Sequence, residues 1–483
     1  MIDLRPVLWV IGVLLSLLAL AMGLLAVVDL AWLGHETAVF AAAAGFTLFI
    51  GASLILANHH RRPQALSLRQ TFLVAAVGWL VIAGASALPF AFAGLNLSPV
   101  DAVFEAVGGV TATSSTILRR LDTVPAGLLL WRGLLQWIGG LGALALGLLV
   151  LPELKVGGMQ LFRLENAGRN EGVTTRATRL ALGVLAIYVG VTAALAGLLW
   201  AAGMNRFDAV VHALSTISCG GFSTQDASIG HWHNAAIDWV ILFGMVLGGA
   251  PFVVYLQLAT RRWRSVVANS QLRWYLTLLV ATSLVIAIWL ILTADLKPLP
   301  ALRHAAFAVA SVMTGTGFAT VDWGNWGGLP AAVLLLLTFI GGCAGSTAGG
   351  IKIFRLQVLI ASARVQMIQL LHPSSVLLPR YEGRPVPEAV SDSVLGYLFV
   401  FLFSFAVLAM GLSLTGLDFA SAISASASAL ANLGPGLTPS VGPTEGYAHL
   451  PDAAKWMLAA GMLFGRLELF LVLALFSRGF WRD

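Results

Sequence analysis

Long apolar runs recur along the whole chain, separated by short polar stretches. A run such as 11–28 is apolar on every face, which is typical of a helix in lipid and not of a barrel strand with alternating sides. Because about 20 apolar residues cross a bilayer, the pattern predicts ten spans, the first retained rather than cleaved as a signal peptide. They cover residues 7–33, 38–58, 70–93, 126–151, 180–203, 235–260, 274–295, 330–370 (interrupted), 392–415 and 453–477.

Four of the loops between these spans repeat one pattern at intervals of roughly 100 residues. Each has a semi-apolar segment of about a dozen residues, too short to cross the bilayer, followed by a strip of small and hydroxyl-bearing residues. The four copies cover 101–118, 208–225, 304–321 and 421–438. Irregular backbone at membrane depth is tolerated only where it lines a cavity or is buried in protein. We therefore expect four re-entrant helices, each followed by a non-helical strip.

The four strips have the chemistry of a cation filter. Short helix C-termini carry partial negative charge, and backbone carbonyls with Thr and Ser hydroxyls can replace the water around a monovalent cation. Small residues also let membrane helices pack closely, but four copies in register favour the filter. The predicted filter residues are Thr111, Ala112, Thr113, Ser114, Ser218, Cys219, Gly220, Gly221, Thr314, Gly315, Thr316, Gly317, Ala431, Asn432, Leu433 and Gly434.

Composition and charge indicate the class of protein and its orientation in the membrane. Only 10% of residues are charged and the mean hydropathy is +0.88, as in an integral membrane protein. When loops are assigned alternately to the two sides, 20 of the 28 Lys and Arg residues fall on one side. By the positive-inside rule this side, with both termini, is cytoplasmic. The net charge of +6 is thus a topology signal and does not predict nucleic-acid binding.

Two further features within the spans carry candidate chemistry. A glycine-rich run interrupts the eighth span and should face the pathway, although a tolerated kink or close helix packing is the alternative. Arg466 lies near the middle of the last span, where a charge is costly; pairing with Glu468 or snorkelling is the alternative. The predicted gate residues are Gly345, Ser346, Thr347, Ala348, Gly349, Gly350, Lys352 and Arg466.

Several ordered motifs resemble the TrkH-type membrane subunit of bacterial potassium uptake systems, in the Trk/Ktr/HKT superfamily. The most specific are STISCGGFST (215–224), IGGCAGSTAGGIK (340–352), NLGPGL (432–437) and LFGRLE (463–468). The resemblance covers nearly the whole chain. It implies an all-α polytopic membrane protein with two N-terminal helices and four membrane-pore-membrane repeats, whose re-entrant pore loops surround a pseudo-fourfold axis. The corresponding segments are 1–66, 67–165, 166–268, 269–385 and 386–483.

The same resemblance implies function and partners. It suggests K⁺ transport across the bacterial inner membrane by a homodimer. A cytoplasmic regulatory ring of the TrkA type would bind ATP/ADP or NAD(H), and the cytoplasmic segments 155–179 and 371–388 are either its docking surface or solvated linkers. The run after residue 340 would be the intramembrane loop that closes the pathway below the filter, and Arg466 an electrostatic barrier beside it.

Ser114 departs from the family pattern, which has a glycine at this position of each strip. Ser resists positive φ and adds a hydroxyl, and in plant members Ser here accompanies sodium preference. K⁺ transport is the leading hypothesis, with a Na⁺-preferring channel as the alternative and a cation-coupled secondary transporter as a further one. His231 and His233 could suggest a metal site, but no third ligand is near in sequence. No catalytic arrangement of residues is found, so we do not expect an enzyme.

Overall fold

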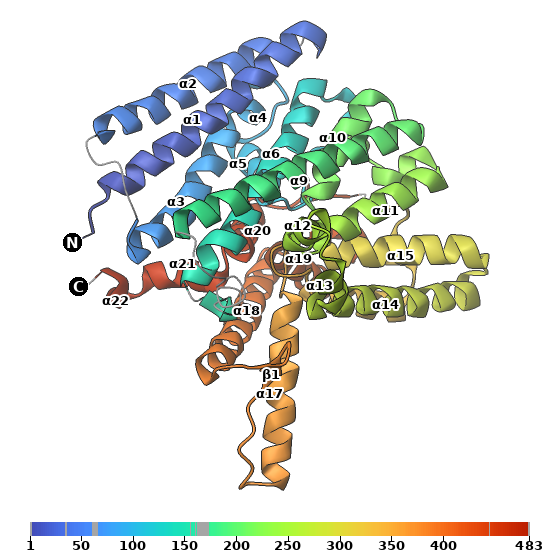
Figure 1. Cartoon of the computed structure of the whole chain (residues 1–483). Helices are drawn as coiled ribbons and strands as arrows, with labels where there is room; N and C mark the ends of the chain where they lie inside the picture. The colour runs from blue at the N-terminus through green and yellow to red at the C-terminus, as the bar shows by residue number, and fades with distance from the viewer. Residues whose placement is uncertain are drawn as a thin grey trace.

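The structure, a computed structural model, describes residues 2–33, 36–59, 66–154, 156–159, 161, 173–443 and 445–481. Most of these residues are helical (Figure 1). The sheet they form is a single antiparallel hairpin of β1 (Arg380–Tyr381) and β2 (Arg384–Pro385). The fold therefore confirms the all-α class.

Seven helices of the described chain are long and apolar enough to cross a membrane. The first ends in a π-helical turn at Asp29–Leu33, and the third is followed by the short α4 (Leu88–Phe92). Their outer faces carry many exposed large apolar side chains, as lipid contact requires. They are α1 (Arg5–Val28), α2 (Thr37–Ala57), α3 (Leu68–Ser86), α6 (Ala126–Ala145), α9 (Val173–Ala201), α14 (Ser270–Ala294) and α18 (Glu388–Leu414).

Two spans expected to be continuous are bent instead. α11 (Ala235–Gly249) meets α12 (Phe252–Ala259) at 96°, and α20 (Asp452–Arg466) meets α21 (Leu469–Phe476) at 107°. The ranges 235–260 and 453–477 thus hold apolar helices as predicted, but the sequence did not predict the bends within them. In the first pair Pro251 has no amide hydrogen and holds the preceding residue extended; in the second, Glu468 has a φ of +60°, which no α-helix accommodates.

The eighth predicted span is interrupted as expected. α16 (Gly328–Phe339) and α17 (Ile353–Leu371) are separated by a non-helical segment, 340–352, called here the α16–α17 loop. α17 then projects beyond the rest of the molecule, with the hairpin beside it (Figure 1). Together with the seven long helices and the two bent pairs, this interrupted segment makes ten candidate spans in the described chain, the number predicted from the sequence.

The four short segments that precede the strips are helices. They are α5 (Pro99–Val110), α10 (Arg206–Ile217), α15 (Pro298–Thr314) and α19 (Phe419–Ala431). Three have side-chain N-caps, in which Ser98, Asn205 and Asp418 each accept a hydrogen bond from the backbone amide three residues later. Hydrogen bonds from Ser421 lower the pKa of the Asp418 carboxyl, so this cap stays charged at neutral pH.

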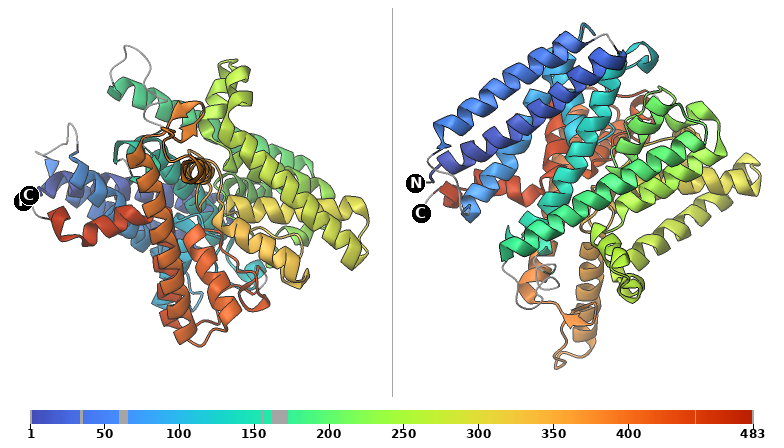
Figure 2. Two further views of the ribbon diagram at one scale, coloured as in Figure 1. Left: turned by 90° about the horizontal axis from the view of Figure 1, so that it is seen from below. Right: turned by 45° about the horizontal axis from the view of Figure 1, so that its top comes forward.

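The remaining elements are short. They are α7 (Leu151–Leu154), α13 (Trp263–Ala268), α22 (Arg478–Trp481), a π turn (Leu146–Val150) and 3₁₀ turns at Leu121–Thr123, Val156–Gly158, Ser228–Trp232, Trp323–Asn325 and Pro439–Val441. The two ends of the described chain lie on one side of the molecule (Figure 2), where Ile2 and Phe480 join one apolar cluster. An even number of membrane crossings would place the two ends in this way.

Two large apolar clusters enclose the short helices. One packs α5 and α19 against α6 and α20 through residues such as Phe104, Trp131 and Leu458. The other packs α10 and α15 against α11 and α14 through residues such as Tyr275 and Phe307. The strips at the ends of the short helices are thereby held inside the protein.

Candidate ion pathway

The four short helices end in the same hydrogen-bond pattern. We call the residues that follow or close them strip 1 (111–114), strip 2 (218–221), strip 3 (314–317) and strip 4 (431–434). In each strip the amide of the third residue donates to the carbonyl five residues earlier, a helix C-terminal closure. These bonds are Thr113 to Gly108 (2.8 Å), Gly220 to Ser215 (2.8 Å), Thr316 to Ser311 (2.9 Å) and Leu433 to Ser428 (2.9 Å).

The second residue of every strip has a left-handed backbone. The φ angles are +51° at Ala112, +52° at Cys219, +76° at Gly315 and +54° at Asn432. The third-residue closure needs this conformation, which costs free energy at the three positions that are not glycine. Fifteen of the sixteen predicted filter residues are buried, and Ser114 is half-buried.

The fourth residues of the strips meet at close range. Gly221, Gly317 and Gly434 have positive φ angles of 78°, 78° and 107°, and Ser114 does not. A Cβ added at Gly317 or Gly434 would overlap the hydroxyl of Ser114, and one at Gly221 would overlap the carbonyl oxygen of Thr316. The ring therefore has room for one side chain, and Ser114 supplies it, with Oγ donating to the Leu433 carbonyl at 3.1 Å.

The threonine hydroxyls, expected from the sequence to help bind a cation, form hydrogen bonds within their own strips and helices instead. Thr111 Oγ1 donates to the Val107 carbonyl at 2.7 Å, and Thr314 Oγ1 does the same to Ala310 at 2.7 Å. Each is also paired with the next threonine of its strip, at 2.8 and 2.7 Å. These hydroxyls close the helix ends, so the backbone carbonyls remain as the main candidate cation ligands.

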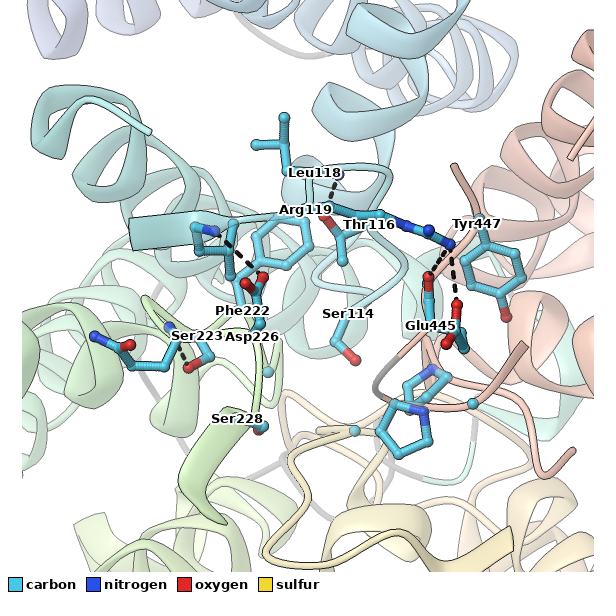
Figure 3. Close-up of a pocket in the computed structure, with 18 of the residues that line it drawn as sticks. Ser114, Thr116, Leu118, Arg119, Phe222, Ser223, Asp226, Ser228, Glu445 and Tyr447 are labelled. Atoms are coloured by element: carbon cyan, nitrogen blue, oxygen red, sulfur yellow. Dashed lines mark hydrogen bonds and ion pairs between the residues drawn. The ribbon is translucent and has the colours of Figure 1, made fainter. Parts of the chain in front are cut away.

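A cavity of about 370 Å³ opens on one side of the ring, and Ser114, Gly221 and Gly317 line it. We call it the outer vestibule. Figure 3 shows Ser114 pointing into it, with Phe222 and Tyr447 on opposite sides. At its edge Arg119 Nη2 lies 3.1 Å from Glu445 Oε2, and both side chains are about half exposed.

A buried ion pair between α5 and α6 holds the chain that follows strips 1 and 2. Arg132 Nε lies 2.7 Å from Glu105 Oε1, and neither side chain is more than 1% exposed. Glu105 also accepts from the Thr116 hydroxyl and the Ile117 amide, while Arg132 donates to the Ser223 carbonyl at 3.0 Å. Arg132 is an internal residue of α6, and its hydrogen bonds connect Glu105 of α5 with the chain that follows strip 2.

Two more side chains hold strip carbonyls in place. Gln136 donates to the Gly220 carbonyl at 2.7 Å and accepts from the Phe222 amide at 3.0 Å. Tyr447 donates its hydroxyl to the Gly434 carbonyl at 2.6 Å. Sequence reasoning missed these residues and the Glu105–Arg132 pair; a Glu and a Gln inside otherwise apolar helices were the available signal.

The α16–α17 loop lies directly against strips 2 and 4. Thr347 Oγ1 is 2.9 Å from the Ile217 carbonyl and 3.2 Å from Cys219 Sγ. Gly349 is so close to strip 4 that an added Cβ would overlap the Ala431 carbonyl. The predicted gate residues of this loop are thus brought together beneath the ring, and Lys352 Nζ donates back to the Ala348 carbonyl.

Arg466 ends α20 at the bend beside this loop. Its Nη1 donates to the Thr347 carbonyl at 2.9 Å, and its Nη2 reaches the Gly139 carbonyl at 3.5 Å. The side chain is 6% exposed, so it does not snorkel. Glu468 contacts Arg355 at 2.6 Å, which removes the simple Arg466–Glu468 pair considered from the sequence.

Two cavities lie on the loop's other faces. One of about 40 Å³ is lined by the loop, Asn432, Arg466 and Glu468. Another of about 380 Å³ is lined by Gly345 with polar residues such as Gln257 and Gln271. The loop therefore separates the ring from a larger space on the side from which α17 projects.

The family model for TrkH, described as a cation transport protein, matches residues 36–481. The chain belongs to the TrkH family. It is 39% identical over 482 residues to the Trk system potassium uptake protein TrkI of Halomonas elongata, covering 99% of this chain and 97% of that protein. It is 36% identical to TrkH of Salmonella typhimurium, covering 99% of each chain.

The crystal structure of the potassium transporter TrkH from Vibrio parahaemolyticus has the same fold. The TM-score is 0.91, with 33% sequence identity and complete coverage of both chains. The TrkH fold thus includes the helices that carry the four strips and the α16–α17 loop. Segment 155–179, predicted to be cytoplasmic, lies partly outside the described residues.

Proposed function

We propose that this TrkH family protein passes K⁺ through the ring of strips 1 to 4. The observation that carries the proposal is the identical closure of four short helices, which brings four sets of backbone carbonyls to one place. Each closure leaves a helix C-terminus, with its partial negative charge, facing the ring. Carbonyl rings of this kind replace the hydration shell of a monovalent cation. Its relatives are named as potassium uptake proteins.

The repeat division follows from the same pattern. Each of the segments 67–165, 166–268, 269–385 and 386–483 contains one short helix, one strip and two flanking membrane helices, and 1–66 contributes the two extra helices. We place these four units around a pseudo-fourfold axis through the ring. The chain would lie in the bacterial inner membrane with both termini in the cytoplasm, as its basic loops indicate.

The gate in this proposal is the α16–α17 loop together with Arg466. The loop lies between the ring and the larger cavity, and it is fixed by hydrogen bonds of Thr347 to the Ile217 carbonyl at the end of α10 and to Arg466. A buried cation in a cation pathway is a barrier because its repulsion is weakly screened there. Displacement of the loop and of Arg466 would open the pathway.

Partners are proposed on the cytoplasmic side. The end of α17 and the chain after it carry exposed apolar side chains, with Leu370, Leu371 and Val376 at 82%, 77% and 96% exposure. Apolar residues of this kind outside the bilayer suit contact with another protein. We assign this region to a homodimer and to a TrkA-type regulatory ring, with ATP/ADP or NAD(H) bound on the ring.

Appreciable Na⁺ permeation is the second candidate, and Ser114 favours it. Its side chain occupies space that the other three strips leave to glycine, and its hydroxyl engages a strip 4 carbonyl. A narrowed or partly engaged ring fits the smaller ion better. We therefore expect K⁺ over Na⁺ selectivity weaker than an all-glycine ring would give.

The test is cation flux from liposomes that contain the purified protein. The wild type should release K⁺ down its gradient, and Gly317→Ala should abolish release by filling the ring. Gly383→Ala is the matched control, because Gly383 has nearly the same φ of +77° but lies in the open hairpin. Equal flux from both variants, or none from the wild type, would overturn the proposal.

A further inference from the structure

The 40 Å³ cavity below the ring has an unbalanced set of charges. Lys352, Arg466 and Glu468 line it, and Glu468 is the only acidic residue among its described lining residues. Glu468 in turn contacts Arg355, whose side chain is fully buried. Three buried or half-buried cations therefore lie in or beside a cavity with one carboxylate among its described lining residues, and that carboxylate contacts Arg355.

Glu468 connects two elements of the fold. It lies at the bend between α20 and α21, two residues after Arg466, with a φ of +60° that only a constrained segment retains. Arg355 is on α17, one turn after Lys352, and α17 is the helix that projects from the molecule (Figure 1). The carboxylate thus joins the bend of the last span to the helix that leaves the membrane.

The arginine that contacts this carboxylate and the arginine that lines the cavity with it each have an unused donor. Arg355 Nη1 and Arg466 Nε are both buried and have no hydrogen-bond partner among the described residues. Arg355 is otherwise held by the Gly157 carbonyl at 2.9 Å and by the Tyr397 ring, 3.7 Å from its guanidinium carbon. Arg355 can therefore keep its position when the carboxylate turns toward the cavity, where Arg466 has a free donor.

We propose that Glu468 is the counter-charge of the gate, divided between Arg355 and the cavity cations Lys352 and Arg466. While Arg355 holds it, the cavity stays positive and opposes a cation. When α17 moves and the Arg355 contact lengthens, the carboxylate neutralises the cavity and cations pass. The inference rests on the proposed cation pathway and adds to it the residue that sets the barrier height.

The test uses two variants that should change K⁺ flux in opposite directions. A purely structural role for the ion pair would predict the same direction for both. Glu468→Gln removes the counter-charge and should lower K⁺ flux in liposomes about ten-fold, as a unit charge a few ångströms away in a poorly screened site would. Arg355→Gln releases the carboxylate to the cavity and should raise flux. Loss of a structural pair would instead change flux in the same direction in both variants, which would overturn the proposal.

Two controls make the result specific. Glu388→Gln, an exposed residue at the start of α18, changes the net charge equally and should leave flux unchanged. The double variant Arg355→Gln/Glu468→Gln leaves no unpaired buried partner and should still conduct as poorly as Glu468→Gln. Recovery of wild-type flux in the double variant would contradict the proposal, whereas absence of flux from the wild type would contradict the cation pathway itself.

Discussion

The charged groups above and below the ring are arranged in opposite ways. Above it, the buried cations have carboxylate partners: Arg132 pairs with Glu105, and Lys455 lies 2.6 Å from Asp101. Below it, Lys352 and Arg466 are held by backbone carbonyls, and the nearest carboxylate is shared with Arg355. The upper pairs join side chains of different helices, whereas in the proposed pathway the lower charges would repel cations. We therefore expect the upper charges to matter for stability and the lower charges to matter for flux.

The largest effect is expected from breaking the upper pair. Arg132→Ala leaves Glu105 buried without a partner and should destabilise the protein by about 3–5 kcal/mol. Thermal unfolding in detergent measures this. Arg119→Ala is the matched control, because its half-exposed pair with Glu445 contributes about 1 kcal/mol or less; equal losses from both variants would show that burial does not matter here.

Removal of the buried charge of Arg466, below the ring, should affect flux rather than stability. Arg466→Ala eliminates a buried cation that lies against Thr347 and should raise basal K⁺ flux about ten-fold, with little loss of stability. Arg478→Ala, an exposed residue beyond α21, serves as the control. A fall in flux would show that Arg466 stabilises the ring, as Arg132 does, and would contradict its role as a barrier.

The carbonyl supports should act on selectivity. Tyr447→Phe removes one hydrogen bond to the Gly434 carbonyl, worth about 1 kcal/mol, and should change the K⁺/Na⁺ permeability ratio several-fold. Tyr255→Phe is matched to it, since the Tyr255 hydroxyl donates to the Leu247 carbonyl, which is not in a strip. Equal changes in selectivity from the two variants would show that Tyr447 has no special role.

The smallest effect is expected at the mouth of the outer vestibule. Glu445→Gln should lower K⁺ flux about two-fold at low ionic strength and Arg119→Gln should raise it, because each leaves one unpaired charge near the entrance. Both differences should disappear in high salt. Changes that persist in high salt would indicate a structural role for the pair.

Local sequence patterns were sufficient to predict the helices and strips but not their long-range contacts. The repeated strips identified α5, α10, α15 and α19, because small residues and a short apolar segment recur at a regular interval. Nothing local predicted that Glu105 and Arg132, 27 positions apart, would pair. The bend at Glu468 was also missed: nothing local marks its positive φ, and its side chain contacts Arg355, which is 113 residues away. The alternative pairing of Arg466 with Glu468 rested on sequence proximity alone.

The central claim is that the ring of fourth strip residues sets cation selectivity. Reversal potentials under K⁺ and Na⁺ gradients, in bilayers holding the wild type or Ser114→Gly, test it most directly. We expect a modest preference for K⁺ in the wild type and a shift toward the K⁺ equilibrium potential in the glycine variant. Identical reversal potentials for the two proteins would contradict the claim and move the site of selection away from the ring.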